Sequence, residues 1–329
     1  MKSMTTVFYS EKLDEKFLNK IREELRTAFK GCKKIAIKIH FGEPGNKYAF
    51  VPEDIKPITN ILKDVGLDFF LFDSSVRYNS IRANPLTHKK YAIKKGWGEL
   101  GEIVTNDEFI TVKAKMMDYE VCKTLADADG VLVISHVKGH LCSGFGGAIK
   151  NLGMGALTPK SKGDIHSGAS PVFSGECKQC RACELACPMG TLKVTADGPE
   201  FGLCFSCSDC IYACPEGLIK PRVAPFDYLL AEGASCAQKK FKKEYYISYL
   251  TNIVKLCDCN SDPGKLIAKD SGFLASSDIV AIDAASHDII TKKAGEDVFL
   301  KFNKKGGMEQ VQEAEKLGMG SSKYNLVKT

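Results

Sequence analysis

Two copies of one cysteine pattern constrain this chain more than any other feature of its sequence. Both copies have the spacing C-x2-C-x2-C-x3-C-P, in which a proline follows the fourth cysteine. The first copy is Cys177, Cys180, Cys183 and Cys187, and the second is Cys204, Cys207, Cys210 and Cys214. Each short spacing lets three thiolates converge on one centre from a tight loop. The fourth cysteine, on the helical turn that follows, points toward the other centre.

This spacing is the one that ligates cubane iron–sulfur clusters in bacterial-type ferredoxins, where the fourth cysteine binds the other cluster. We therefore expect two 4Fe-4S clusters with crossed ligand sets. Cluster 1 is assigned to Cys177, Cys180, Cys183 and Cys214, and cluster 2 to Cys204, Cys207, Cys210 and Cys187. Two zinc knuckles are the alternative, because C-x2-C pairs also bind zinc tetrahedrally. The tandem repeat with its terminal prolines favours clusters and predicts an electron-transfer module.

The rest of the chain is long enough to build a packed core around this module. Its 329 residues are 44% hydrophobic, which suits two domains. The start of the chain lacks an apolar secretory segment, and no apolar run reaches the length of a membrane helix, about eighteen residues. We therefore expect the fourteen cysteines to be reduced thiols and cluster ligands in a cytoplasmic protein. Oxygen-sensitive clusters point to an anaerobic or microaerobic host.

The charge pattern bears on the partners of the protein. The net charge of +6 is mild, and the lysines and arginines are scattered. A nucleic-acid-binding protein would need a concentrated basic stripe with stacking aromatics, so we expect no nucleic-acid partner. Acidic side chains outnumber basic ones around the two cysteine repeats. This balance favours the docking of a redox protein partner with a basic surface.

Strand and helix patterns alternate on both sides of the cysteine-rich segment. We expect strands at 34–41, 68–72 and 130–135, and helices at 13–29, 55–65, 228–241 and 277–292. Ser276 or Ser277 is the expected cap of the last helix, and 245–257 fits either a helix or a strand. The order predicts an α/β fold with a mainly parallel sheet and flanking helices, interrupted by an inserted ferredoxin-like α+β module.

The predicted domain boundaries follow from this order. We place the N-terminal part of the α/β domain at 1–170, the ferredoxin-like insertion at 171–221, and the C-terminal part that completes the α/β domain at 222–329. The insertion is too short to fold on an apolar core alone, so cluster ligation must hold it together.

A second dense motif, SHVKGHLCSGFGGAIKNLGMG at 135–155, follows the predicted strand at 130–135 directly. Its residues should lie at the carboxyl end of that strand, where open α/β sheets bind ligands. The segment from 148 onward is expected to present a helix N-terminus to an anion. A structural glycine turn is the alternative, and a flavin is a further candidate ligand. The candidates are His140 and Lys150 for catalysis, and Gly144, Gly146, Gly147 and Asn151 for cofactor binding.

Cys257 and Cys259, one residue apart, form a third feature. Such a pair can share a metal ion or form a redox disulfide, and two packed core thiols are the alternative. If a metal ion binds there, the candidates to complete its shell are His136, His140, Cys142 and His166. The remaining cysteines, at 32, 122 and 236, belong to no motif and are expected to be packing residues.

Two carboxylates are further candidates. Asp73 follows the predicted strand at 68–72, and a carboxylate at a strand end can orient a histidine or bind a ligand, so we include it among the catalytic candidates. Asp283 lies in the helix predicted at 277–292. A turn cap and a helix-surface charge are the respective alternatives.

Taken together, these motifs resemble one family. Four motifs are similar to those of the domain-of-unknown-function 362 iron–sulfur proteins. They are the run H-x-K-G-H-x3-G-F-G-G-A-x-K-N-L-G-M-G at 136–155, the double ferredoxin motif, the C-D-C at 257–259 and the S-D-I-V-A-I-D at 277–283. The resemblance covers nearly the whole chain. It implies the fold and the clusters of a cytoplasmic iron–sulfur centre protein from an anaerobe, without a settled reaction.

A shorter stretch, from His140 to Lys150, resembles the H-x3-G-x-[ST]-G-G-x-K motif of nickel-pincer lactate racemases. This resemblance implies that Lys150 anchors a nickel–pincer cofactor and that His140 is an acid–base group. The chain departs from the motif, because a hydroxyl-bearing residue is missing and the gap before Lys150 is longer.

Three functions fit the sequence. We favour an iron–sulfur oxidoreductase, in which two clusters exchange electrons with an unknown small molecule at the 136–155 loop. A non-enzymatic ferredoxin-like electron carrier or adaptor, and a metal-dependent isomerase related to the nickel-pincer racemases, are the alternatives. The oxidoreductase requires the glycine-rich loop and the Cys257–Cys259 pair to face one pocket close to a cluster, whereas a carrier requires no such pocket.

Overall fold

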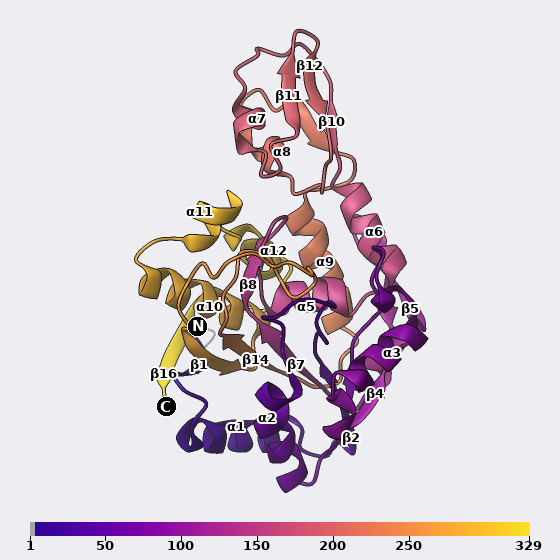
Figure 1. Ribbon diagram of the computed structural model, residues 1–329, viewed down its shortest axis with the longest axis vertical. Coiled ribbons are helices and arrows are strands. Elements are labelled where there is room, and N and C mark those ends of the chain that lie inside the picture. Colours follow the sequence, from indigo (N-terminus) through magenta and orange to yellow (C-terminus); the bar gives the residue numbers. More distant parts are fainter. Residues whose placement is uncertain (1–3) are drawn as a thin grey trace.

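An eight-stranded sheet forms the centre of the computed structural model, which describes residues 4–329 (Figure 1). From edge to edge its strands are β16 (Tyr324–Lys328), β1 (Thr5–Ser10), β15 (Gly272–Ser276), β14 (Glu244–Leu250), β7 (Val131–His136), β2 (Lys34–Lys38), β3 (Asp68–Phe72) and β4 (Glu102–Val104). Only β15 is antiparallel to its neighbours in this sheet. The predicted mainly parallel α/β fold is confirmed.

Helices cover both faces of the sheet (Figure 1). The helices of the α/β part are α1 (Glu15–Ala28), α2 (Pro52–Asp64), α3 (Pro85–Lys94), α4 (Lys123–Asp127), α5 (Ala148–Gly155), α6 (Pro159–Gly168), α9 (Phe226–Gln238), α10 (Ile279–Ala294), α11 (Val298–Asn303) and α12 (Met308–Lys316), with short 3-10 turns at Ile81–Ala83 and Trp97–Glu99. One buried cluster contains α1 and α2, and a second contains α5, α9 and α10. Successive side chains of β7 enter the two clusters alternately, as the two-residue period of a strand requires.

Local signals explain why these elements form where they do. Asp14 caps α1 by accepting a hydrogen bond of 3.1 Å from the backbone N–H of Phe17. Phe17, Ile21 and Leu25 then recur every four residues and bury one face of the helix. The helices predicted at 13–29, 55–65, 228–241 and 277–292 correspond to α1, α2, α9 and α10.

Three predictions at element boundaries need correction. The strand expected at 34–41 ends at Lys38, because the chain then turns so that the N–H of Phe41 reaches Asp73 at 3.4 Å. The ambiguous segment 245–257 is strand only up to Leu250 and loop beyond it. The cap of α10 is Asp278 rather than Ser276 or Ser277, because its carboxylate accepts two backbone N–H bonds of 2.9 Å.

The cysteine-rich segment projects from one end of the α/β part (Figure 1). Its elements are β10 (Pro171–Phe173), α7 (Ala182–Ala186), β11 (Leu192–Thr195), β12 (Gly198–Phe201), α8 (Asp209–Ala213) and β13 (Ile219–Pro221). Two small antiparallel sheets, β10–β13 and β11–β12, lie outside the large sheet. Strands from before and after this segment, β7 and β14, pair with each other, so both flanks build one sheet.

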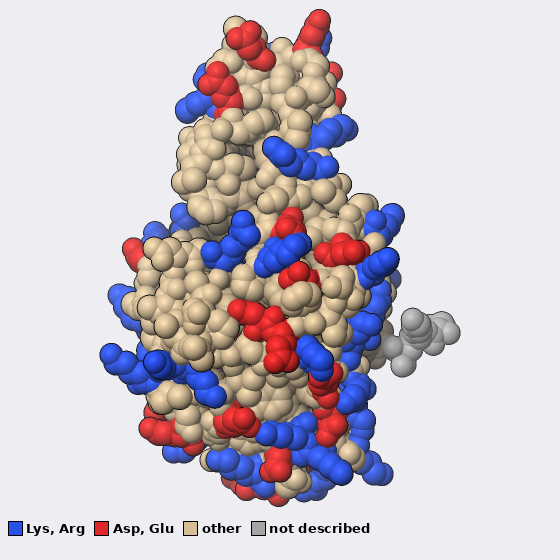
Figure 2. Space-filling view, turned by 90° about the vertical axis from the view of Figure 1, so that its right-hand side faces the viewer, with Lys and Arg blue, Asp and Glu red and all other residues tan. Residues whose placement is uncertain are grey.

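Two further hairpins complete the fold, β5 (Phe109–Lys113) with β6 (Asp118–Cys122) and β8 (Lys138–His140) with β9 (Gly144–Gly146). None of the helices in residues 4–329 has both the length and the apolar character that a membrane span needs. On the face in Figure 2, basic and acidic side chains are interspersed rather than gathered into a stripe of one sign.

A carboxylate of the chain itself occupies the N-terminus of α5. Asp283 of α10 is fully buried and accepts hydrogen bonds from the N–H groups of Ala148 and Ile149, at 2.7 and 2.9 Å. Burial raises the pKa of this carboxyl to about 7, although the two N–H groups oppose the shift. The expectation that this helix end receives an external anion is therefore wrong, because Asp283 already fills the position.

We expect Asp283→Ala to lower the free energy of unfolding by about 2–3 kcal/mol, since it leaves buried N–H groups without an acceptor. Asp288→Ala, which removes an exposed carboxylate from the same helix, is the matched control and should cost much less. Denaturant unfolding of both variants measures the difference, and equal losses would show that Asp283 does not hold α5.

Candidate functional site

The carboxyl ends of β2, β3, β7 and β14 lie next to one another along one side of the sheet, which we call the sheet edge. After β2, the chain forms β3 and β4 on one side of that strand. The later strands β7 and β14 lie on the opposite side of β2, so the strand order reverses between β2 and β7. Open α/β sheets bind ligands outside the carboxyl ends of strands at such a switch point. Side chains at or just beyond the ends of these strands, including His40, Asp73 and His136, line two adjoining cavities here.

The larger cavity has a volume of about 520 Å³ and is lined from both parts of the chain. The α/β part contributes Lys38, His40, Asp73, Arg82, His140, Lys150, Asn151, Lys162, His166 and Cys259, among others. The second cysteine repeat contributes Cys204, Phe205 and Ser206. Such a volume suits a small organic molecule. One cavity therefore joins the edge of the sheet to the second cysteine repeat.

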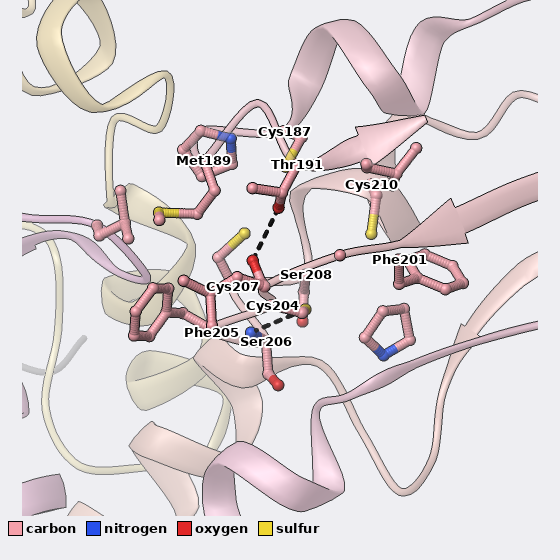
Figure 3. A pocket seen from close by; sticks show the side chains of 16 residues that line it. Cys187, Met189, Thr191, Phe201, Cys204, Phe205, Ser206, Cys207, Ser208 and Cys210 are labelled. Carbon is pink, nitrogen blue, oxygen red and sulfur yellow. Dashed lines mark hydrogen bonds between the residues drawn. The ribbon is translucent and has the colours of Figure 1, made fainter. Parts of the chain in front are cut away.

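Each set of four cysteines that the sequence predicts lines one cavity in the projecting segment. Cys187, Cys204, Cys207 and Cys210 line the first, and Figure 3 shows their sulfur atoms around a common space. Cys177, Cys180, Cys183 and Cys214 line the second. The thiols are thus grouped in the crossed arrangement, while the identity of the group that they bind stays a prediction.

The backbones of the two repeats are folded alike. Gln179 and Ser206 hold corresponding positions with φ of 54° and 59°, and so do Arg181 and Ser208 with φ of 59° and 71°. In both repeats the N–H of the first of these residues donates to the sulfur of the first cysteine at 3.3 Å. Non-glycine residues rarely adopt positive φ, so its recurrence shows a specific loop conformation. Thiols converging from such loops, with N–H···S bonds, fit cubane iron–sulfur clusters.

Asp73 lies at the centre of a buried ion-pair network. Its Oδ1 is 3.1 Å from Nζ of Lys38, and its Oδ2 is 2.8 Å from the Arg82 guanidinium, which also pairs with Glu43 at 3.0 Å. Burial alone would raise the pKa of Asp73, but Lys38 and Arg82 hold it well below its usual range. This geometry favours an orienting carboxylate; the catalytic role of Asp73 stays a prediction.

His140, Lys150 and the Cys257–Cys259 pair meet beside the glycine-rich loop. The two cysteines are joined in a disulfide, and a ring nitrogen of His140 and both sulfurs lie within 4.8 Å of one another. Nζ of Lys150 is 3.5 Å from Sγ of Cys257. Burial lowers the pKa of Lys150 to about 8 and that of His140 well below its usual value. Two sulfur atoms are therefore flanked by a neutral imidazole and by an ammonium whose pKa is lowered.

The other predicted partners of this pair are engaged elsewhere. His136 stacks on Phe50 and is 3.0 Å from the carboxylate of Asp258. Cys142 and His166 both donate hydrogen bonds to the carbonyl of residue 205, at 3.3 and 3.0 Å. Of the four candidates, His140 is the one that the described residues place with the two cysteines.

The predicted cofactor-binding residues also serve the protein itself. A Cβ on Gly147 would lie 2.3 Å from Asp283, and a Cβ on Gly144 would lie 2.5 Å from the backbone of Gly307. Asn151 donates to the carbonyl of residue 134 and the hydroxyl of residue 135. Gly146, Gly147 and Asn151 line the smaller cavity, whereas Gly144 lines neither cavity at the sheet edge.

Four cations of this site were not among the candidates predicted from the sequence, namely Lys38, Arg77, Arg82 and Lys162. Lys38 carried a usable signal, because a lysine within an otherwise apolar strand needs a buried partner. Arg82 and Lys162 stand in segments without a motif, so neither could have been found from spacing alone.

The family described as "Domain of unknown function (DUF362)" matches residues 35–288. The chain belongs to this family. No curated protein matches the chain.

Two solved structures are similar to it. One is a protein from Thermotoga maritima, at 13% identity and a TM-score of 0.40, with 73% of this chain and 52% of that chain covered. The other is the lactate racemase apoprotein from Thermoanaerobacterium thermosaccharolyticum, at 14% identity and a TM-score of 0.40, with 86% of this chain and 56% of that chain covered. The match thus spans about half the length of each of these proteins.

We expect Asp73→Ala to lower the free energy of unfolding by about 3–5 kcal/mol, because removing one partner leaves buried charges uncompensated. Since its pKa is depressed in the folded protein, this stabilisation should be full above about pH 4 and should decline as the medium becomes more acidic. Asp64→Ala is the control, since it removes an exposed partner of Arg22. Denaturant unfolding at neutral and acidic pH tests this, and a loss no larger than that of the control would contradict it.

Proposed function

We propose that this protein is an iron–sulfur oxidoreductase, in which two 4Fe-4S clusters exchange electrons with a small molecule in the sheet-edge cavity. The observation that carries the proposal is the position of Cys204. This residue lines both the cavity of the second cysteine set and the cavity of about 520 Å³ at the edge of the sheet. A protein that only carries electrons between partners needs no such pocket beside a cluster ligand.

In this proposal the projecting segment, 171–221, is a ferredoxin-like insertion held together by its clusters. Cluster 1 is bound by Cys177, Cys180, Cys183 and Cys214, and cluster 2 by Cys204, Cys207, Cys210 and Cys187. The clusters, when bound, supply single electrons. The buried apolar residues of the segment are few, and two of the four are the cysteines Cys183 and Cys210. Metal ligation must therefore provide much of its folding free energy.

The residues of the α/β part would bind the substrate and move protons. Lys150 has a pKa lowered to about 8, so its ammonium can hold an anionic group or donate a proton near neutral pH. When the Cys257–Cys259 disulfide is reduced, its two thiolates and the ring of His140 would hold a metal ion. Three protein ligands leave a coordination position open, as in catalytic metal sites.

A metal-dependent isomerase is the second candidate function. It is favoured by the grouping of His140, Cys257 and Cys259, with the amine of Lys150 3.5 Å from Cys257. In that case the clusters would be structural, and Lys150 would carry a covalent adduct. The mass of the intact, anaerobically isolated chain separates the two functions, because an adduct favours the isomerase.

We expect anaerobically purified or reconstituted protein to contain about eight irons and eight acid-labile sulfides per chain. The double variant Cys204→Ser/Cys207→Ser should retain about four of each, since it removes two ligands of one cluster only. Cys32→Ser, at a half-buried cysteine outside both repeats, should retain all of them. The test is iron and sulfide analysis together with electron paramagnetic resonance of the dithionite-reduced protein. Zinc bound in place of iron would overturn the proposal.

We also expect the reduced protein to bind about one further metal ion per chain, such as zinc, nickel or iron, at the Cys257–Cys259 pair. Cys257→Ser should abolish this binding and leave the cluster iron unchanged. Cys236→Ser, at a buried cysteine on α9, is the matched control and should bind normally. Equal metal content in the Cys257→Ser and wild-type proteins would rule out the third site.

A further inference from the structure

We infer that the ligand of the sheet-edge cavity is a small organic anion, and that Lys162 binds its charged group. The inference rests on the proposed function only in treating this cavity as the reaction site. It adds the substrate class, which the proposed function leaves open.

Lys162 reaches the cavity from α6, the helix that leads into the projecting segment (Figure 1). The residue is only 9% exposed, and its Nζ donates to the hydroxyl of Ser74 at 2.8 Å and to the carbonyl of Ser75. Both partners are neutral, and these are the only protein hydrogen bonds of its Nζ within the described part of the chain. A lysine ammonium has three N–H donors, so one is left for a ligand.

The wall of the cavity carries more positive than negative charge. Asp73 is the only carboxylate among its lining residues, and Lys38 and Arg82 already bind both of its oxygens. Lys150 and Lys162 line the same wall, and neither forms an ion pair with a carboxylate within residues 4–329. Burying an ammonium without a counter-charge is costly. A bound anion would supply that counter-charge.

The desolvation of Lys162 agrees with this charge balance. Burial lowers the pKa of its ammonium to about 8. An anion beside Lys162 would favour the charged form and raise its pKa again. Anion binding and protonation of Lys162 are therefore coupled.

The rest of the wall indicates that the anion is organic. Val76, Met154 and Phe205 present apolar surface to the cavity, together with the polar side chains of Tyr78 and Ser167. Pockets for organic ligands combine a mainly apolar lining with a few placed polar groups in this way. A bare inorganic ion would gain nothing from the apolar surface, whereas a carboxylic acid or a phosphate ester would bury its carbon skeleton there.

The test uses the full-length, cluster-loaded protein and isothermal titration calorimetry. The probes are succinate, glycerol 3-phosphate and the neutral analogue succinamide. We expect at least one of the two anions to bind with a Kd below about 1 mM, and succinamide to bind far more weakly. The anion that binds more tightly shows whether the cavity recognises a carboxylate or a phosphate ester.

Variants on α6 test the role of Lys162. Lys162→Met should weaken binding of the better anion about tenfold or more, because it removes a charged hydrogen bond. Lys160→Met is the matched control, since Lys160 is exposed on the same helix and pairs with Asp164 at 2.6 Å. Lys162→Arg should retain most of the affinity. Unchanged iron content and melting temperature show that each variant is folded.

The pH dependence supplies a readout that a purely structural role would not affect. The anion affinity should fall as the pH rises through about 8, where Lys162 loses its proton. The charged or titratable groups that act on Lys162 include Asp73, Cys122, Lys38, Arg82 and His88. Burial raises the pKa of the Cys122 thiol to about 12 and lowers that of His88 to about 4, both far from this range. Lys162→Arg, whose guanidinium stays charged, should show a weaker dependence on pH.

The outcomes separate this inference from the proposed function. If neither anion binds more tightly than succinamide, or if Lys160→Met weakens binding as much as Lys162→Met, the inference is overturned. Because the binding assay requires no electron transfer, clusters that cannot be reduced would overturn the proposed function alone. Reducible clusters without anion binding would overturn the inference alone.

Discussion

The shared direction of β2, β3, β7 and β14 is the constraint on which the rest of the structure depends. It brings four carboxyl ends to one edge of the sheet, although the strands are far apart in the sequence. The ion pairs of Asp73 with Lys38 and Arg82 then tie the ends of β2 and β3 to the loop that follows β3. Each of these charges would be costly to bury alone, so the network is stable only as a unit.

Sequence patterns predicted the parts of this protein that depend on short spacings. The crossed grouping of Cys187 with the 204–210 cysteines follows from a local repeat, whereas the positive φ shared by Gln179 and Ser206 is a local feature that the spacing did not predict. The strand at 130–135 and the glycine-rich loop after it were predicted for the same reason, since a buried strand and its following turn are contiguous. Local chemistry is readable because the interacting residues are neighbours along the chain.

The parts that could not be predicted depend on contacts between distant segments. The sequence made Asp283 a candidate functional carboxylate, with a helix-surface charge as the alternative, but its position opposite α5 makes it the cap of another helix. Lys162 has no motif around it, and it enters the cavity only because α6 packs beside the loop at 74–75. The size of the cavity is equally non-local, because Cys204 and Lys38 come from parts that meet only in the folded chain.

A buried charge holds the cysteine-rich segment against the α/β part. Lys305, between α11 and α12, reaches the carbonyl of Cys207 at 2.7 Å, Asp227 of α9 at 2.7 Å and Asp209 of α8 at 3.4 Å. Burial alone would lower the pKa of Lys305, but the two carboxylates raise it, so the ammonium stays charged. An ammonium with partners on three segments restricts how the second cysteine repeat can move relative to α9. The wall that Cys204 forms is therefore fixed over the sheet edge, and this is the geometry that the proposed electron exchange with a bound molecule would require.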